Sequence, residues 1–208
     1  MTRREQRRLA FLRVSGWEQA QMTPLAGDAS NRRYLRLTCS PDHRRAILMD
    51  ADPNTGGTQQ AFVEMASYLI AAGFSAPHIF AADLAQGFVL LEDFGDAVFA
   101  QMLVDAPAQE AALYRSAADC LAALHRQPAA KRLLQTTPDV LAKLIAPAFE
   151  WYAAKAAPDN TQNAQTATVA LLATSLQRHA PQCSVTVLRD FHAENLIWLP
   201  GRKGICRV

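Results

Sequence analysis

The hydrophobic pattern of the chain changes near residue 95, and this change restricts the folds that the sequence can adopt. Residues 34–37 and 45–50 alternate apolar and polar side chains, which is typical of half-buried strands. Beyond residue 96 the apolar residues recur at helical spacing, most clearly at Leu113, Ala117, Cys120, Leu121 and Leu124. We therefore expect an α+β fold, with most strands in the first half of the chain and most helices in the second.

Turn residues and apolar periodicity divide the chain further. In the first half they predict a helix, a hairpin, a second helix and two more strands, over residues 5–21, 34–50, 62–70, 76–79 and 87–91. In the second half they predict helices over 113–125, 138–156 and 163–179, a strand over Val185–Leu188, and a hairpin with arms Leu196–Leu199 and Ile205–Val208. Two domains are expected: a β-rich N-terminal lobe over residues 1–95 and a helical C-terminal lobe over residues 96–208.

The composition is typical of a soluble protein. With 208 residues, half of them hydrophobic, the chain can bury a core, and its formal charge of +2 favours neither a nucleic acid nor an anionic membrane as partner. No stretch approaches the roughly 18 uninterrupted apolar residues of a membrane span, and no signal-peptide pattern follows the N-terminal arginines. The cysteines lack C-x-x-C spacing, as expected for free thiols. We expect a cytoplasmic protein with no nucleic-acid partner and no membrane partner.

One short segment carries most of the chemical information. Leu188–Asn195 places Asp190 five residues ahead of Asn195, and an apolar run follows directly. This is the layout of a phosphoryl-transfer loop, in which the Asp accepts the proton of the hydroxyl and the Asn holds Mg²⁺ on the nucleotide phosphates. Asp190 is therefore the predicted catalytic base and Asn195 the predicted metal ligand. His192 is expected to orient the loop, while Arg189 contacts either a phosphate or a structural carboxylate.

Two segments of the first half are candidates for nucleotide binding. Gly27, Asp28, Ala29 and Ser30 form a loop of small and polar residues, whose backbone N–H groups can face phosphates. The start of an ordinary hairpin has the same composition, so the loop indicates phosphate binding only in combination with the Asp-Asn motif. Glu92 lies in the segment expected to link the two lobes, where backbone groups can hydrogen-bond an adenine ring.

A positive charge expected on the second hairpin strand is missing. Kinase-like folds pair a strand lysine with a Glu on the following helix, for which Glu64 is the candidate. Met49 stands where the lysine is usual. Arg32, Arg33 and Arg45 are alternative sources of the charge, and Glu64 is equally well explained as a solvated helix residue.

With these residues in place, the chain resembles the aminoglycoside phosphotransferase/choline kinase-like family, and more narrowly its bacterial N-acetylmuramate/N-acetylglucosamine 1-kinases. The matching segments are Gly27–Tyr34, Ile47–Ala51, Gly87–Gly95 and Leu188–Asn195. The resemblance implies a two-lobed protein-kinase-like fold, ATP and Mg²⁺ as cofactors, and transfer of the γ-phosphoryl group to a sugar hydroxyl. In that branch the acceptor is the anomeric hydroxyl of an amino sugar, and the product feeds peptidoglycan recycling.

The resemblance also assigns roles to residues. It implies that Asp190 is the base, that Asn195 binds Mg²⁺, that Gly27 to Ser30 cover the phosphates and that the region of Glu92 holds adenine. The family continues past the position of Val208 into a segment whose Asp serves the second metal site. We therefore expect the chain to be C-terminally truncated, with little or no activity as given.

Two alternatives stay open at the level of the sequence. One is a phosphotransferase of the same family with another small hydroxylated acceptor, such as an amino alcohol, a fructosamine or an aminoglycoside. The other is a non-catalytic nucleotide-binding protein, to which the missing strand lysine and the missing metal Asp point. ATP binding that depends strongly on Mg²⁺ would favour an enzyme over a non-catalytic protein.

Overall fold

The structure is a computed structural model that describes residues 1–25, 32–40, 42–53, 59–156, 160–182 and 184–208. The chain divides into two compact units. The first combines Met1–Leu124 with Leu188–Val208, and the second is His125–Val187. The predicted lobe boundary at residue 95 lies inside the first unit and stays a prediction.

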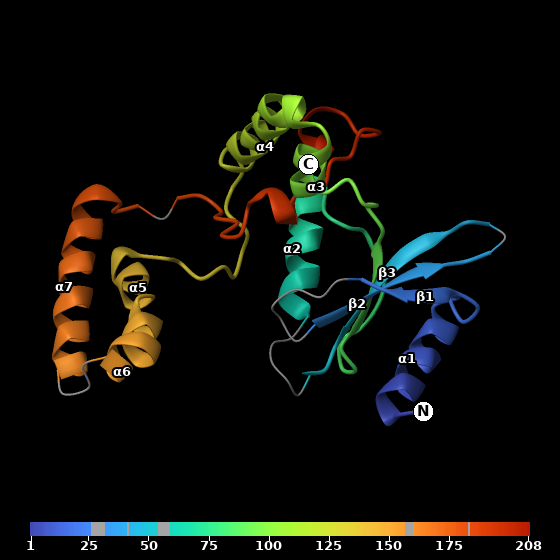
Figure 1. Cartoon of the computed structure of the whole chain (residues 1–208), viewed down its shortest axis with the longest axis horizontal. Helices are drawn as coiled ribbons and strands as arrows, with labels where there is room; N and C mark the ends of the chain where they lie inside the picture. Colours follow the sequence, from blue (N-terminus) through green and yellow to red (C-terminus); the bar gives the residue numbers. More distant parts are fainter. Residues whose placement is uncertain (26–31, 41, 54–58, 157–159, 183) are drawn as a thin grey trace. The chain divides into compact units, whose positions relative to one another are not determined.

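A five-stranded antiparallel sheet forms the centre of the first unit (Figure 1). In spatial order its strands are β1 (Gln21–Pro24), β2 (Arg32–Thr38), β3 (Arg45–Ala51), β5 (Phe88–Glu92) and β4 (Ile79–Asp83). The β2–β3 hairpin that alternation predicted is confirmed, with Tyr34 opposite Met49. Because side chains alternate between the faces of a strand, Tyr34, Arg36 and Met49 share one face of this sheet.

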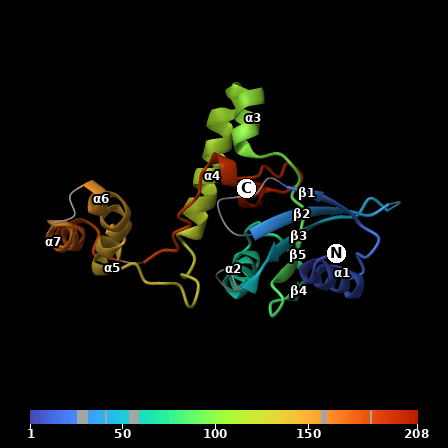
Figure 2. The same ribbon diagram turned by 60° about the horizontal axis from the view of Figure 1, so that its bottom comes forward.

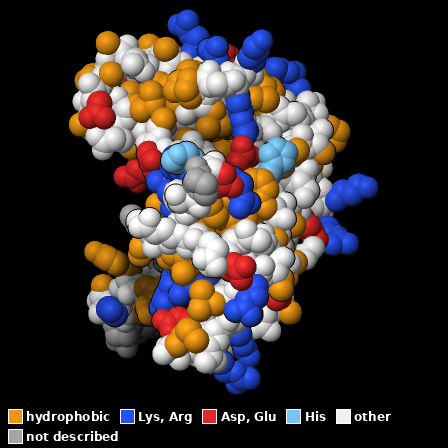
Figure 3. Space-filling model, turned by 90° about the vertical axis from the view of Figure 1, so that its right-hand side faces the viewer, with side chains coloured by type: hydrophobic (Ala, Val, Ile, Leu, Met, Phe, Trp, Pro, Cys, Tyr) orange, Lys and Arg blue, Asp and Glu red, His pale blue; other side chains and the backbone are white. Residues whose placement is uncertain are grey.

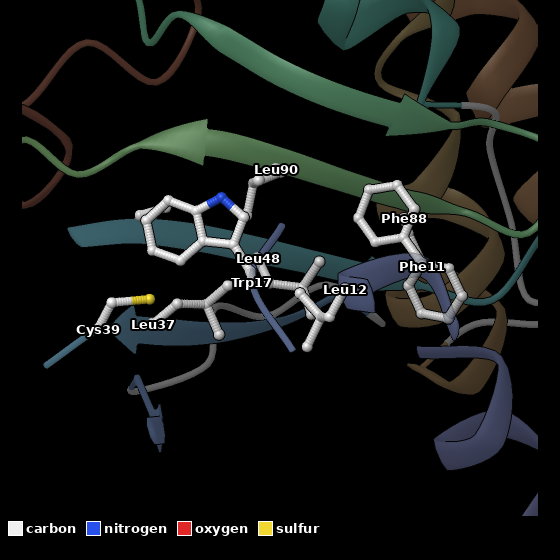
Figure 4. Packing of buried hydrophobic residues seen from close by; sticks show 9 residues of the cluster. Phe11, Leu12, Trp17, Leu37, Cys39, Leu48, Phe88 and Leu90 are labelled. Atoms are coloured by element: carbon white, nitrogen blue, oxygen red, sulfur yellow. The ribbon is translucent and has the colours of Figure 1, made fainter. Parts of the chain in front are cut away.

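Two helices cover opposite faces of the sheet, as Figure 2 shows: α1 (Arg3–Val14) and α2 (Gln60–Ala71). On the α1 face, Phe11 stacks on Phe88 with ring centroids 5.5 Å apart. Figure 4 shows this cluster, which also contains Leu12, Trp17, Leu37, Cys39, Leu48 and Leu90. On the other face, Phe62 and Val63 of α2 pack over Met49, Val89 and Leu91.

The first helix is shorter than its sequence pattern predicted. It begins with a reciprocal cap, in which Thr2 Oγ1 accepts from the Glu5 N–H while the Glu5 carboxylate accepts from the Thr2 N–H. It ends at Val14 rather than near residue 21, because Gly16 takes a left-handed φ of 75° and the chain turns there. Trp17 then folds back into the core, and the chain continues into β1.

The rest of the first unit consists of short elements around one longer helix. The helix predicted over 113–125 is confirmed as α4 (Glu110–Leu124), which buries every residue of its predicted apolar stripe except Leu121, which is half-buried. It follows α3 (Phe99–Asp105) and a 3₁₀ turn, η2 (Pro107–Gln109). Near the C-terminus lie two further 3₁₀ turns, η5 (Ala193–Asn195) and η6 (Gly204–Arg207).

Two strand predictions in the last part of the chain were wrong. Val185–Leu188 is not a strand; Val187 is exposed, and β-branched residues form a strand only where a neighbour supplies a ladder of hydrogen bonds. Ile205–Val208 lies largely in η6 rather than in a hairpin arm. A single backbone bond, from Leu199 N–H to the Arg207 carbonyl at 2.8 Å, replaces the expected ladder.

The second unit is helical, as predicted. It contains α5 (Pro138–Lys143), a π-helix, η3 (Ala148–Ala153), which continues into α6 (Ala154–Ala156), and α7 (Thr161–His179). α5 and α7 lie side by side (Figure 1).

Two further observations concern the helices and the surface. Among the described residues, no helix is both long and apolar enough to cross a membrane. On the face shown in Figure 3, basic side chains are interspersed with acidic and apolar ones.

Candidate active site

The Asp-Asn motif forms a tight loop at the start of the C-terminal segment of the first unit. The Asp190 N–H donates to the Leu188 carbonyl at 2.6 Å, and the preceding residue, Arg189, has a left-handed φ of 51°. A non-glycine residue in this conformation stores backbone strain, commonly about 1–3 kcal/mol, and such residues concentrate at functional sites. The turn leaves the side chain of Asp190 exposed to solvent, so its carboxylate can meet a substrate.

Asn195, the predicted metal ligand, is hydrogen-bonded to the backbone of Asp190, the predicted base. Its Nδ2 donates to the Asp190 backbone carbonyl at 3.0 Å and lies 3.2 Å from His192 Nε2. Because an amide nitrogen only donates, His192 Nε2 accepts, which places the proton of the neutral ring on Nδ1, 3.9 Å from Glu194. With its nitrogen committed in this way, Asn195 has Oδ1 as the atom that can face a cation.

Backbone bonds tie the end of the loop to the chain after β5. Trp198 N–H donates to the Ala97 carbonyl at 2.7 Å, and Phe99 N–H donates to the Leu196 carbonyl at 2.9 Å. Between these bonds Val98 and Ile197 form an antiparallel bridge. Leu196 and Phe99 are buried. The Asp190–Asn195 loop therefore ends on a segment held against residues 97–99.

Glu92, at the end of β5, has a carboxylate whose two oxygens are both engaged. Oε1 lies 2.6 Å from Nη2 of Arg202, and Oε2 accepts from the His78 N–H at 3.2 Å. Arg202 was not among the residues that the sequence pointed to, because it lies 110 positions away in a turn of ordinary composition. The Glu92 side chain therefore links the end of β5 to the turn that contains Arg202.

Arg36 was also missed, although it shares a sheet face with Met49. Its guanidinium meets both carboxylate oxygens of Asp93, at 2.9 and 3.1 Å, and Nη1 lies 2.7 Å from Asp96. Burial alone would lower the pKa of Arg36, but the hydrogen bonds to Asp96 and Asp93 outweigh that effect and raise it. Arg45 joins the same group through Asp93 at 2.9 Å. Two arginines thus anchor the segment after β5 to the hairpin.

Because Met49 carries no charge, it cannot form the lysine–glutamate ion pair of a typical kinase-like fold with Glu64. Met49 is fully buried at the centre of the sheet. Glu64 accepts a hydrogen bond from Gln60 at 2.7 Å on its own helix. Of the alternative cations, Arg45 pairs with Asp93 and Arg33 is exposed.

A cavity of about 340 Å³ lies behind the loop, and its lining is mainly apolar. Leu188, Phe191 and Asn195 form one wall, while α4 contributes Cys120 and Leu124. Such a lining does not suit phosphate groups. Asp190 is not among the residues that line it.

The residues of the loop suit a magnesium ion. Mg²⁺ prefers hard oxygen ligands, keeps several waters, and is commonly held by one or two protein oxygens together with substrate phosphates. Asn195 Oδ1 is an oxygen of this kind, and the hydrogen bond made by the amide nitrogen leaves it to face a cation. The phosphate-covering candidates Gly27, Asp28, Ala29 and Ser30 lie outside the described residues.

The fold and this loop agree with the kinase-like class that the sequence predicted, and comparisons with known proteins identify the family. The model of the phosphotransferase enzyme family matches residues 21–205. A curated relative from Caulobacter vibrioides, named N-acetylmuramate/N-acetylglucosamine kinase, is 35% identical and covers 99% of this chain. Relatives of the same name from Pseudomonas aeruginosa and Pseudomonas putida are 31% and 29% identical and cover 92% and 94% of it.

The chain belongs to the phosphotransferase enzyme family. This membership and the five-stranded antiparallel sheet with its helices confirm the predicted α+β, kinase-like fold class. The chain spans 65%, 56% and 57% of the lengths of the three relatives, in the order given.

Proposed function

We propose that the protein transfers the γ-phosphoryl group of ATP to a sugar hydroxyl, the anomeric hydroxyl of an amino sugar in cytoplasmic cell-wall recycling. Membership of the family and the names of the relatives support this proposal. The observation that carries it is the hydrogen bond from Asn195 to the Asp190 carbonyl. This bond holds a candidate base and a candidate metal ligand on one short, strained loop.

The chemistry assigned to the chain's own residues is a proton transfer and the positioning of two reactants. As the sugar oxygen attacks the γ-phosphorus, its proton passes to the carboxylate of Asp190, and the bond from that phosphorus to the bridging oxygen of ADP breaks. The exposure of Asp190 keeps its carboxylate accessible to an acceptor. ADP and the sugar phosphate are the products.

The nucleotide contacts are proposed by position. Gly27, Asp28, Ala29 and Ser30 would cover the phosphates, and backbone groups next to Glu92 would hold adenine. Asn195 would hold Mg²⁺, which neutralises phosphate charge when bound. In this scheme residues 1–95 act as the nucleotide-binding lobe and residues 96–208 as the lobe that carries the loop.

The test is a coupled ATPase and sugar-phosphorylation assay on the polypeptide purified from its native locus. N-acetylmuramate and N-acetylglucosamine are compared with an amino alcohol, a fructosamine and an aminoglycoside. Asp190→Asn is expected to lower kcat by about 10²–10⁴-fold, the range of general base catalysis, with ATP affinity within a few-fold of the original. Asp119→Asn, at an exposed position on α4, is the matched control and is expected to keep full activity. Coupling of phosphorus to the anomeric proton in NMR identifies the hydroxyl.

Each outcome separates the proposal from its alternatives. Transfer to an acceptor other than the two sugars would keep the reaction class and replace the substrate. Nucleotide binding without metal dependence and without transfer to any acceptor would favour the non-catalytic protein. An Asp190→Asn variant with unchanged kcat would remove Asp190 from the chemistry.

A further inference from the structure

Arg202 contacts more segments of the first unit than its place in an ordinary turn suggests. Its Nη2 lies 2.6 Å from Glu92 Oε1, and its Nη1 donates to Ser75 Oγ at 2.7 Å. The guanidinium also lies 4.8 Å from the ring centroid of Phe94, a cation–π distance. One side chain therefore joins the end of β5, the segment that follows it and the connection between α2 and β4.

The turn that carries Arg202 is itself held by several bonds. The Arg202 N–H donates to the Leu199 carbonyl at 3.0 Å, and its carbonyl accepts from Arg207 Nε at 3.2 Å. Ser75 Oγ, which accepts from Arg202, donates to the Cys206 carbonyl at 2.6 Å. Backbone bonds thus hold the turn, and Ser75 connects the Arg202 guanidinium to the Cys206 carbonyl in the same turn. About a third of the Arg202 side chain is exposed.

This turn follows the Asp190–Asn195 loop after only a few residues. The intervening residues are the ones whose backbone bonds to Ala97 and Phe99 were described above. Two independent connections therefore join the linker, residues 92–99, to the segment that leaves the loop. One is the backbone bridge at Val98 and Ile197, and the other is the Arg202 side chain.

We propose that Arg202 is a positioning residue that fixes the linker relative to the Asp190–Asn195 loop. The inference rests on the proposed function, in which the linker holds the nucleotide base and the loop holds the acceptor hydroxyl. Phosphoryl transfer depends mainly on placement, and a shift of about 1 Å can lower a rate by 10²-fold. Arginine suits this role because its planar guanidinium bonds Glu92 and Ser75 at once, whereas the single ammonium of lysine does not reproduce this geometry.

The first measurement needs no turnover. Amide hydrogen exchange is followed at Phe99, Trp198 and Leu199, whose N–H groups make the bonds described above. Arg202→Gln is expected to raise their exchange rates about tenfold or more. Lys203→Gln removes the same charge from an exposed neighbour in the same turn and is expected to leave them unchanged. Equal rates in the two variants would overturn the inference.

The second measurement separates positioning from mere structural support. Per folded molecule, Arg202→Gln is expected to raise KM for ATP and to lower kcat by about tenfold each, with partial recovery in Arg202→Lys. The double variant with Glu92→Gln is expected to match Arg202→Gln within about twofold, because Glu92 acts through its contact with Arg202, which Arg202→Gln already removes. Faster exchange without any change in kcat or KM would make Arg202 a structural residue and overturn the inference. If the polypeptide from the native locus showed neither phosphoryl transfer nor ATP binding, the proposed function would be refuted. The exchange rates would still decide whether Arg202 ties the linker to the loop.

Discussion

Arg4 holds Asp50 with two nitrogen atoms: Nε and Nη2 lie 2.8 and 2.6 Å from the same carboxylate oxygen. The pair connects α1 to β3 across 46 positions, and the Asp50 side chain is only 6% exposed. Arg4 also stacks on Phe88, with its guanidinium carbon 4.0 Å from the ring centroid, and donates to the Gln86 carbonyl. These contacts place α1 on the sheet face opposite α2.

Asp50→Asn is predicted to destabilise the first unit. The substitution removes the charge that balances Arg4 and Arg8, and breaking a buried ion pair from one side typically costs about 3–5 kcal/mol. Because about a quarter of the Arg4 side chain is exposed, water offsets part of the loss, and we expect about 2–4 kcal/mol from urea unfolding. Asp42→Asn, which breaks the exposed pair with Arg44, is the control and should leave the midpoint unchanged. Equal midpoints for the two variants would contradict the prediction.

Gly87→Ala is predicted to disturb the turn between β4 and β5. Gly87 has a left-handed φ of 73°, and a Cβ at this position would lie 1.8 Å from the Ala51 carbonyl oxygen. That oxygen belongs to the backbone, so the turn must move and the Ala51 N–H would lose its 2.9 Å bond to the Gly87 carbonyl. We expect a loss of at least about 2 kcal/mol in the free energy of unfolding.

The matched control for this prediction is Gly201→Ala. A Cβ at Gly201 meets open space, and its φ is not left-handed. Thermal unfolding followed by circular dichroism should show a lowered midpoint for Gly87→Ala and an unchanged one for Gly201→Ala. A shift of the same size in both would point to a general effect of alanine rather than to the clash.

Local patterns predicted the elements whose formation depends on nearby residues. Alternation identified β2 and β3, and the period of 3.6 identified α2 and α4, because in each case a buried face imposes the repeat. The four-residue strand β1 escaped prediction since it is too short to show a repeat, and its ladder depends on β2.

Most contacts of the candidate site could not be predicted from the sequence, because their partners lie far apart along the chain. Asp190 and Asn195 are five positions apart, so their spacing is visible in the sequence, and the hydrogen bond between them agrees with it. Arg36 meets Asp93 across 57 positions and Arg202 meets Glu92 across 110. A charge in a sequence does not identify its partner at such distances, so ion pairs of this kind follow only from the fold.

Cys120 is predicted to resist alkylation and to lower the free energy of unfolding as the pH becomes alkaline. Burial raises the pKa of its thiol, and the nearby Cys206 adds to the effect. A raised folded-state pKa means that folding favours the protonated thiol. The corresponding stabilisation is therefore complete below the thiol's unfolded pKa, about 8.5, and is lost as pH rises through the folded value.

Two measurements check this prediction. Iodoacetamide at pH 8 should modify Cys120 far more slowly in the folded protein than in urea, as followed by peptide mass spectrometry. Between pH 7 and pH 10 the free energy of unfolding should fall less in Cys120→Ala than in the original protein. Rapid labelling of Cys120 in the folded chain would show that its thiol is accessible and ionised.

Asn195→Ala is predicted to remove the metal dependence of nucleotide binding and to loosen the loop. The variant loses Oδ1, the proposed Mg²⁺ ligand, and also the Nδ2 bond to the Asp190 carbonyl. In the original protein, EDTA should weaken ATP binding by tenfold or more in calorimetry, whereas in the variant EDTA should change it less than twofold. Asn163→Ala, exposed on α7, is the control and should keep the full effect of EDTA. If EDTA weakened binding equally in Asn195→Ala and in the original protein, the metal would be held by other residues and Asn195 would serve only to shape the loop.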